Sequence, residues 1–256
     1  MPAEVSSTGS TQHSTDHTFT TANAHAMNGT SQRALTLIVA ATKDLGIGKD
    51  GGLPWPQLKQ EMGYFARVTK RQSQSQATKT INAVVMGRKT WDSIPAKFRP
   101  LKGRLNVVVS RSMKQETTPS GPEGPLIVAS LEVAMEELHK REEHVPNEHV
   151  GDSHHNVGDI FIIGGSSIYD AALAMPITKR VLYTKIKQPD YDCDTFFPVN
   201  LDSHQAKEDG WHSKSWKQLV DFAGGADAVG GSEIVASEGH VKEGNVEWEY
   251  CLYEKR

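Results

Sequence analysis

Six short apolar runs, rich in valine and isoleucine, constrain the fold of this chain more than any other feature of its sequence. They span residues 35–41, 83–86, 105–109, 126–128, 160–163 and 181–186. Near-continuous apolar runs of this length are typical of strands buried on both faces, as in a parallel sheet. Turn signals bound the runs, so we expect each run to form a separate strand.

Segments with helical character separate these runs, at residues 57–69, 90–93, 131–140 and 166–174. Alternation of strand and helix predicts an α/β fold, with helices on both faces of a mostly parallel central sheet. Residues 246–252 alternate apolar and other side chains, which predicts a half-buried antiparallel C-terminal strand. In such sheets, ligands bind at the carboxyl ends of the strands.

Polar residues are unevenly distributed, and this sets the expected domain boundaries. Residues 1–33 contain twelve serines or threonines and few large apolar groups, which predicts a disordered tail. We expect residues 34–256 to form a single domain. Polar insertions are expected around residues 113–125, 139–158 and 221–245, and the last of these segments is interpreted as a loop or an insertion.

Composition excludes several classes of protein. A net charge of −3 gives no general attraction to nucleic acid or anionic lipid, and no apolar run approaches the ~18 residues that span a bilayer. Two cysteines, Cys193 and Cys251, fit a reducing compartment, and residues 1–33 lack the apolar run of a secretory signal. We therefore expect a cytoplasmic protein, and we expect a monomer, since neither heptads nor a hydrophobic face demand a partner.

Glu61 lies on an otherwise apolar helix face. Leu58, Glu61, Phe65 and Val68 are spaced by three, four and three residues, so a helix places them on one side. Burial raises the pKa of a carboxyl, and a carboxyl that is protonated near neutrality can deliver a proton to a substrate. The alternative is a rotated helix in which Glu61 is an ordinary surface carboxylate.

Three predicted strands are followed by residues suited to phosphate. These are GRKT at 87–90, SR at 110–111 and GGSS at 164–167. Glycines permit close backbone approach, helix N-termini present free N–H groups, and arginine matches phosphate oxygens with two hydrogen bonds. The alternatives, with no ligand, are a basic helix start, a solvated turn and a tight turn with a serine cap. Together with Glu61, these three segments predict an enzyme that binds a phosphorylated cofactor and transfers a proton.

Five motifs, in this order and spacing, resemble the dihydrofolate reductase family. They are GIGKDGGLPWP at 46–56, VVMGRKTWDSIP at 84–95, RPLKGRLNVVVSR at 99–111, IFIIGGSSIYDAAL at 160–173 and DTFFP at 194–198. The resemblance covers about residues 35–256 and implies the three-layer fold of that family. The extra polar stretches resemble those of a fungal member.

The resemblance implies reduction of 7,8-dihydrofolate to 5,6,7,8-tetrahydrofolate with NADPH, in support of one-carbon metabolism and thymidylate synthesis. Hydride passes to C6 of the pterin and a proton to N5, and antifolates are implied as further ligands of the substrate site. Two alternatives are a related NADPH-dependent reductase of a pyrimidine or another pterin, and a non-catalytic folate-binding protein. Arg104 matches the arginine that pairs with the α-carboxylate of the substrate, and a substrate without that carboxylate would not need it.

By motif position, Glu61 resembles the family's acidic residue, which hydrogen-bonds the pterin and promotes its protonation through water. Thr195 resembles the threonine that orients this carboxylate, and Trp55 resembles the tryptophan that holds an active-site water. The remaining residues implied to bind substrate are Ile38, Val39, Met62, Phe65, Arg104, Ile163 and Tyr169. Within this set, the backbone carbonyls of Ile38 and Ile163 are implied to contact the pterin.

The same resemblance implies a site for NADPH. Arg88, Ser110 and Arg111 resemble the clamp for its 2′-phosphate. The other residues implied to contact the cofactor are Ala40, Ile47, Gly87, Lys89, Thr90, Gly164, Gly165, Ser166, Ser167 and Ile168. The peptide bond between the two glycines of GGSS is expected to be cis, and residues 46–52 resemble the mobile loop that closes over the nicotinamide.

Two other features are interpreted without a function. His139, His144, His149, His154 and His155 are irregularly spaced in a polar segment without partner cysteines, so we expect no metal site there. Cys193 has no histidine beside it in the sequence and is expected to be an inert thiol.

Overall fold

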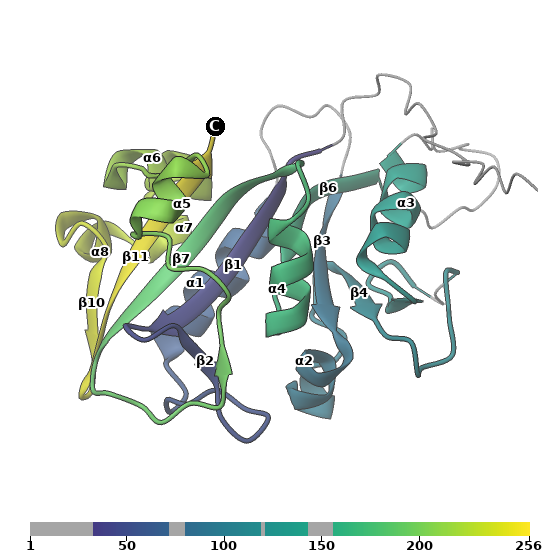
Figure 1. Cartoon of the computed structure of the whole chain (residues 1–256), viewed down its shortest axis with the longest axis horizontal. Coiled ribbons are helices and arrows are strands. Elements are labelled where there is room, and N and C mark those ends of the chain that lie inside the picture. The colour runs from purple at the N-terminus through teal and green to yellow at the C-terminus, as the bar shows by residue number, and fades with distance from the viewer. Residues whose placement is uncertain (1–32, 72–79, 119–120, 143–155) are drawn as a thin grey trace, which may run out of the picture. The chain divides into compact units, whose positions relative to one another are not determined.

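One large sheet forms the centre of the part of the chain that this computed structural model describes, residues 33–71, 80–118, 121–142 and 156–256. Its strands lie in the order β10–β11–β7–β1–β6–β3–β4–β5, with β9 beside β11. Figure 1 shows this order from β10 to β4. These strands are β1 (Leu35–Thr42), β3 (Thr80–Gly87), β4 (Leu105–Val109), β5 (Leu126–Val128), β6 (Asn156–Ile162), β7 (Thr178–Gln188), β9 (Trp211–Ser213), β10 (His240–Glu243) and β11 (Val246–Lys255).

The pairing of these strands confirms the mostly parallel sheet. Every pair from β7 to β5 is parallel, whereas β11 runs antiparallel to β7, β9 and β10. Each of the six predicted runs forms a strand, but β3 and β6 begin earlier than the apolar runs do. Asn82 explains the polar start, because its side chain donates to the Thr69 and Arg71 carbonyls and accepts from the Asp159 amide.

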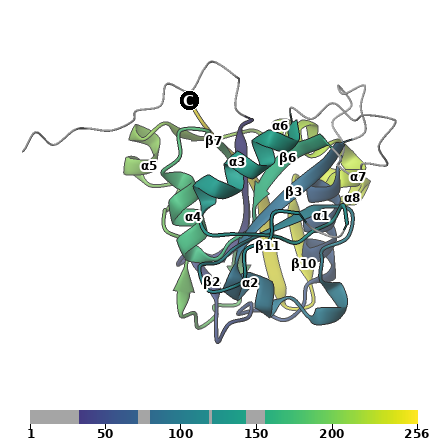
Figure 2. The ribbon, with the colours of Figure 1, turned by 90° about the vertical axis from the view of Figure 1, so that its right-hand side faces the viewer.

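Helices cover both faces of the sheet, as predicted (Figure 2). On one face α3 (Leu131–Glu142) and α4 (Ser166–Leu173) bury apolar side chains in a core with β1 and β6. On the other face α1 (Lys59–Lys70) and α2 (Arg88–Ser93) contribute Tyr64 and Trp91 to a second core. The described residues thus form three layers.

The segment 221–245, expected to be a loop or an insertion, is partly helical and so is not a loop. After α6 (Trp216–Ala223) the chain forms α7 (Ala226–Val229), α8 (Ser232–Ala236) and β10. Gly224 and Gly230 end α6 and α7 with backbone φ of 103° and 120°, which glycine adopts without steric cost. Val229 is 1% exposed and packs in the core that also contains Tyr64 of α1. The loop expectation was wrong because helices of a single turn are too short to show helical periodicity.

Short elements complete the described chain: β2 (Gly46–Gly48), a 3-10 turn η1 (Ala96–Phe98), β8 (Thr195–Phe196) and α5 (His204–Glu208). β2 and β8 pair in a separate two-stranded sheet. Within the described ranges, no helix has both the length and the apolar character needed to cross a membrane. The predicted tail, apart from Arg33, and His144, His149, His154 and His155 lie outside the described residues.

Candidate active site

The carboxyl of Glu61 is buried on the face of α1 that packs against the sheet. Glu61 is 9% exposed, and Leu58 and Val68 on the same face are buried as well. Burial raises the pKa of Glu61 to about 7, so a large share of the molecules hold this proton near neutral pH. The alternative of an ordinary surface carboxylate is therefore wrong.

The hydroxyl that faces this carboxyl belongs to Thr184, not to Thr195. Thr184 Oγ1 lies 3.5 Å from Glu61 Oε1 and donates to it, and Thr184 is 1% exposed. Thr195 lies in β8, where its hydroxyl donates a 2.8 Å hydrogen bond to Asp194 Oδ1. The predicted role of Thr195 is wrong, because the DTFFP segment pairs with residues 46–48 and not with α1.

One signal in the sequence could have identified Thr184. It is a hydroxyl residue within the apolar run 181–186, and in the sheet it pairs with Ala40 of β1. A buried polar side chain in a strand of this kind needs a hydrogen-bond partner. A carboxyl on the helix that covers the strand is such a partner.

Trp55 precedes α1 and is tightly packed. It is 5% exposed and lies in the same core as Leu58. Its ring meets that of Tyr191 edge-on, with centroids 6.1 Å apart. Trp55 therefore anchors the start of α1, and its role in holding a water stays a prediction.

Phe65 and Thr69 follow Glu61 at four-residue intervals along α1, and Arg104 lies beside them. Arg104 Nη1 donates a 2.9 Å hydrogen bond to Thr69 Oγ1, and its guanidinium carbon lies 5.5 Å from the Phe65 ring centroid. Burial lowers the pKa of Arg104 to about 10, which leaves it charged at neutral pH. From Glu61 to Thr69 the helix rises about 12 Å. A carboxyl, a ring and a guanidinium in line suit an elongated ligand that ends in a carboxylate.

The structure places the other predicted substrate residues around β1. The carbonyl of Ile38 accepts a 2.8 Å hydrogen bond from the buried Tyr169 hydroxyl, and Ile163 directly follows β6, next to β1. Met62 is 44% exposed, so its side chain is free to contact a ligand. Val39 packs in the core on the opposite face of the sheet from α1, so only its backbone can serve the predicted contact.

The three segments suited to phosphate come together, because β6, β3 and β4 are neighbours in the sheet. Gly87 pairs with Val109, which directly precedes Ser110. The Gly87 amide donates a 2.7 Å hydrogen bond to the Gly164 carbonyl. Strand ends that are far apart in the sequence therefore form one continuous edge.

Glycines at this edge leave no room for a side chain. A Cβ on Gly164 would lie 3.0 Å from the Tyr169 ring, and one on Gly87 would lie 3.1 Å from Ile168 Cγ1. The peptide bond between Gly164 and Gly165 is cis, as predicted. Gly164 is buried, and Gly87 and Gly165 are partly buried, so these glycines allow the two turns to pack closely against Tyr169 and Ile168.

The N-terminus of α4 lies at the same edge without a side-chain cap. Ser166 Oγ donates a 2.6 Å hydrogen bond to the Phe196 carbonyl, and Ser167 is exposed. The Thr90 hydroxyl lies 3.5 Å from the position that a Cβ on Gly165 would take. The first N–H groups of an uncapped helix favour an anion.

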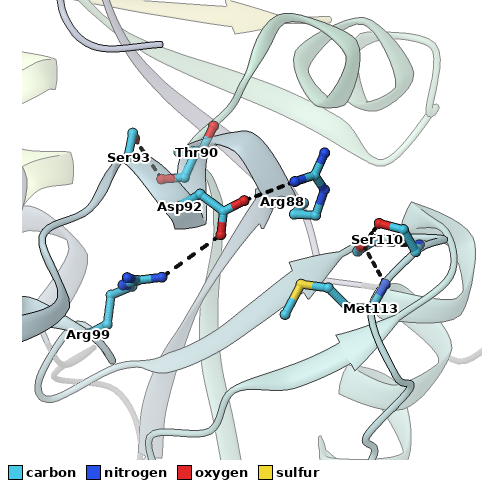
Figure 3. A network of polar contacts seen from close by, with 8 residues as sticks. Arg88, Thr90, Asp92, Ser93, Arg99, Ser110 and Met113 are labelled. Carbon is cyan, nitrogen blue, oxygen red and sulfur yellow. Dashed lines mark hydrogen bonds and ion pairs between the residues drawn. The ribbon is translucent and has the colours of Figure 1, made fainter.

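Arg88, Lys89 and Arg111 place exposed positive charge beside this edge. Arg88 Nη1 lies 3.0 Å from Asp92 Oδ2, one turn along α2 (Figure 3). Exposed pairs of this kind contribute little, so a phosphate can take the place of Asp92.

Ser110 is less open than the predicted clamp requires. It is 5% exposed, and its hydroxyl oxygen accepts from the Ser112 amide at 3.3 Å. The same oxygen accepts from the Met113 amide at 3.1 Å (Figure 3). These bonds order the turn that follows β4. Ser110 therefore shapes the turn that presents Arg111.

The predicted mobile loop, residues 46–52, is tied to the segment before β8. Lys49 Nζ lies 2.7 Å from Asp192 Oδ2, and Ile47 in β2 packs against the core of the α3–α4 face. This ion pair is exposed and contributes little, but the Asp50 amide also donates to Asp194 Oδ2 at 2.8 Å and the Asp194 amide donates to the Gly48 carbonyl at 3.0 Å.

Comparison with known proteins agrees with this geometry. The family model for dihydrofolate reductase matches residues 34–222. A dihydrofolate reductase of Heliothis virescens is 37% identical over 225 residues, 88% of this chain and 99% of that protein. One of Schizosaccharomyces pombe is 36% identical over 241 residues, 87% of this chain and 47% of that protein, so the chain spans about half the length of that relative.

A solved structure gives the same result. The dihydrofolate reductase of Schistosoma mansoni matches with a TM-score of 0.61 and 32% identity, over 88% of this chain and 100% of that one. Relatives from fungi, insects and mammals all match. On this evidence, the chain belongs to the dihydrofolate reductase family.

Proposed function

We propose that Glu61 delivers the proton, with Thr184 as its partner, in the reduction of 7,8-dihydrofolate to 5,6,7,8-tetrahydrofolate that this family catalyses. The reaction adds a hydride to C6 of the pterin and a proton to N5. One observation carries the proposal: the buried Glu61 carboxyl faces a threonine of β7, beside the central strand β1.

The burial of Glu61 suits proton delivery. A proton donor must hold its proton at the working pH and lie within hydrogen-bond reach of the acceptor, directly or through one water. Because burial raises the pKa of Glu61 to about 7, the carboxyl can hold and release a proton near neutral pH. The hydrogen bond donated by Thr184 stabilises the carboxylate that remains after transfer.

Substrate is proposed to lie along α1, with the pterin at Glu61 and the α-carboxylate at Arg104. Phe65 is half-buried between these two ends and would pack on the rings of the substrate. Exposed Met62 would contact the p-aminobenzoyl part. Antifolates with the same outline are proposed to compete for this position.

The residues along the β6–β3–β4 edge fit NADPH. The partly exposed glycines Gly87 and Gly165 and the uncapped start of α4 suit its pyrophosphate. Arg88 and Arg111 are proposed to hold the 2′-phosphate, and Ala40 lies near the nicotinamide end. When bound, NADPH supplies the hydride that C6 accepts.

The direct test of the proposed function follows absorbance at 340 nm with NADPH and 7,8-dihydrofolate. Wild-type protein should consume NADPH, and Glu61→Gln should lose most of its turnover at neutral pH. If Glu61→Gln retained wild-type turnover, the proton-delivery role would be wrong. A reductase of pyrimidines or other pterins has no use for Arg104, so a substrate without a glutamyl carboxylate should react less efficiently than dihydrofolate.

The cofactor clamp has its own test. Arg88→Ala and Arg111→Ala should each reduce the preference for NADPH over NADH by about tenfold or more, because each removes a charged hydrogen bond to phosphate. Asp92→Asn, which removes the carboxylate that pairs with Arg88 and Arg99 but leaves both arginines in place, should keep the preference. An unchanged ratio of kcat/KM values in both arginine variants would remove these residues from the clamp.

We further propose a cytoplasmic monomer, which the free thiols of Cys193 and Cys251 support. Residues 34–256 would be its single domain, and limited proteolysis should remove residues 1–33 first. The polar stretches at 113–125 and 139–158 support a fungal origin within the family.

A further inference from the structure

The carboxylate of Glu243, at the end of β10, caps the first turn of α1 from a distant part of the chain. Lys59 N donates to Glu243 Oε1 and Gln60 N donates to Glu243 Oε2, each at 2.9 Å. Leu58, which precedes the helix, makes no side-chain cap. The first N–H groups of a helix have no acceptor within it, and a carboxylate there also complements their partial positive charge. Glu243 therefore holds the turn from which Glu61 projects.

The sheet connects this cap to the hydroxyl that faces Glu61. Glu243 pairs with Val246 across the β10–β11 turn, and Tyr250 of β11 pairs with Thr184 of β7. Two antiparallel ladders thus fix Glu243 and Thr184 relative to each other. One of these residues binds the first turn of α1, and the other meets the Glu61 side chain that this turn carries.

Packing holds only one side of the first turn of α1, the side on which Leu58 and Glu61 are buried. A crevice of about 240 Å³ lies beside it, lined by Lys59, Gln60, Arg67, Val229, Gly230, Ile234 and Tyr250. Lys59 and Gln60 themselves are exposed. Where apolar contacts are sparse, hydrogen bonds to the backbone contribute more to the position of a segment.

We propose that Glu243 is a positioning residue for the reaction, a role that rests on the proposed proton delivery by Glu61. Its two hydrogen bonds fix the first turn of α1, so that the Glu61 carboxyl stays against Thr184 and away from water. The segment 221–245 thereby takes part in the reaction through its last strand, although none of its residues belongs to the substrate or cofactor sites.

The pH dependence of turnover can report on this role, because the groups around Glu61 do not change charge near neutral pH. Tyr64 of α1, Tyr169 of α4 and Tyr250 of β11 interact electrostatically with Glu61, and burial raises the pKa of each phenol. β7 contributes Thr184, which does not titrate, and β1 contributes apolar side chains at this point. Between about pH 5 and about pH 9, a change of charge here therefore belongs to Glu61.

The experiment measures kcat and KM of Glu243→Ala and Glu243→Gln across this pH range by absorbance at 340 nm. Glu243→Ala should lower kcat about five- to tenfold and move the midpoint of the pH profile down by about half a unit or more, because Glu61 gains water. KM for NADPH should change less than about twofold, since the segments proposed to bind the cofactor follow β6, β3 and β4 and are not part of α1.

Two variants serve as controls. Glu243→Gln loses the charge but keeps one acceptor oxygen, so its kcat and midpoint should lie between those of wild type and Glu243→Ala. Glu247→Gln removes a carboxylate of β11 that pairs with Lys242 at 2.6 Å, and should behave like wild type.

Three results would overturn the positioning role. They are a wild-type kcat and midpoint in Glu243→Ala, equal shifts in the alanine and glutamine variants (an effect of charge alone), and lost thermal stability with an unmoved midpoint. Glu61→Gln in the same series separates the two proposals. If it is inactive while Glu243→Ala matches wild type, only the positioning role fails, whereas an active Glu61→Gln removes the proton-delivery role.

Discussion

The Gly87 amide donates a hydrogen bond to the Gly164 carbonyl, 2.7 Å away, and so joins the turns that follow β3 and β6. The bond holds the starts of α2 and α4 side by side at the edge of the sheet. Both helix starts lack a side-chain cap, so their N–H groups point from neighbouring strands to one region. Phosphate contacts that are far apart in the sequence are thereby available to one ligand.

The stability of the protein should depend on pH through Glu61. Between about pH 4.5 and pH 7 the folded state keeps a proton that the unfolded state has lost, so the free energy of unfolding falls as pH rises, and levels off above that window. Over this window the free energy of unfolding falls by up to about 3 kcal/mol. Glu61→Gln should therefore be more stable than wild type at pH 8 and similar to it at pH 4.5.

Thermal unfolding of both proteins at several pH values checks this. Glu136→Gln is the matched control, because it removes a carboxyl at an exposed position of α3 that folding does not bury. A stability difference between wild type and Glu61→Gln that stayed constant with pH would contradict the raised pKa.

Removal of the Thr184 hydroxyl should shift the pH profile upward. The hydrogen bond to Glu61 lowers the pKa of the carboxyl, so Thr184→Val should raise the midpoint of the kcat/KM profile and reduce kcat about three- to tenfold. Thr195→Val should leave the midpoint unmoved, because its hydroxyl bonds Asp194. Steady-state kinetics across pH would reject the reassignment if Thr195→Val, and not Thr184→Val, moved the midpoint.

A methyl group at Gly46 should disturb the loop 46–52. The added Cβ would overlap both Cβ and Sγ of Cys193, so β2 would have to move. Gly46→Ala should cost about 1–3 kcal/mol of stability and raise KM for NADPH. Gly52→Ala is the matched control, since its Cβ would meet only the Lys49 carbonyl at 3.7 Å. Equal effects of the two substitutions on melting temperature and KM would count against this account.

Arg104→Gln should weaken the binding of a substrate that carries the glutamyl carboxylate and should have little effect on one that lacks it. KM for dihydrofolate should rise about 10- to 100-fold, as expected for a charged hydrogen bond, with a smaller change in kcat. For dihydropteroate, which lacks the glutamyl part, KM should change little. KM for both substrates, measured in parallel, checks this prediction. An equal rise in KM for the two substrates would show that Arg104 supports the fold and does not bind the carboxylate.

The strands and the glycine-containing turns that follow them could be predicted from the sequence, because the signals for both are local. A buried strand shows as an apolar run, and GRKT or GGSS at its end shows where a helix starts. The spacing of Leu58, Glu61 and Phe65 likewise places one face of α1 before any contact is known.

The partner of Glu61 could not be chosen in this way. Thr184 and Thr195 lie eleven positions apart in one stretch of chain, and only the pairing of β7 with β1 and β11, and of β8 with β2, separates their surroundings. The cap from Glu243 is equally invisible, since it acts across the β10–β11 hairpin on a helix far upstream. Contacts set by strand register are properties of the sheet and not of a segment.

The stacking of Tyr250 on Tyr64, with ring centroids 4.1 Å apart, has a consequence for synthesis of the chain. α1 leaves the ribosome long before β11, and until β11 pairs with β7 the side of α1 that carries Tyr64 stays open to water. We therefore expect Glu61 of a nascent chain without β11 to be more hydrated, with a pKa closer to the ordinary value of a carboxyl. On this expectation, the raised pKa of Glu61 is a property of the complete sheet and not of α1 alone.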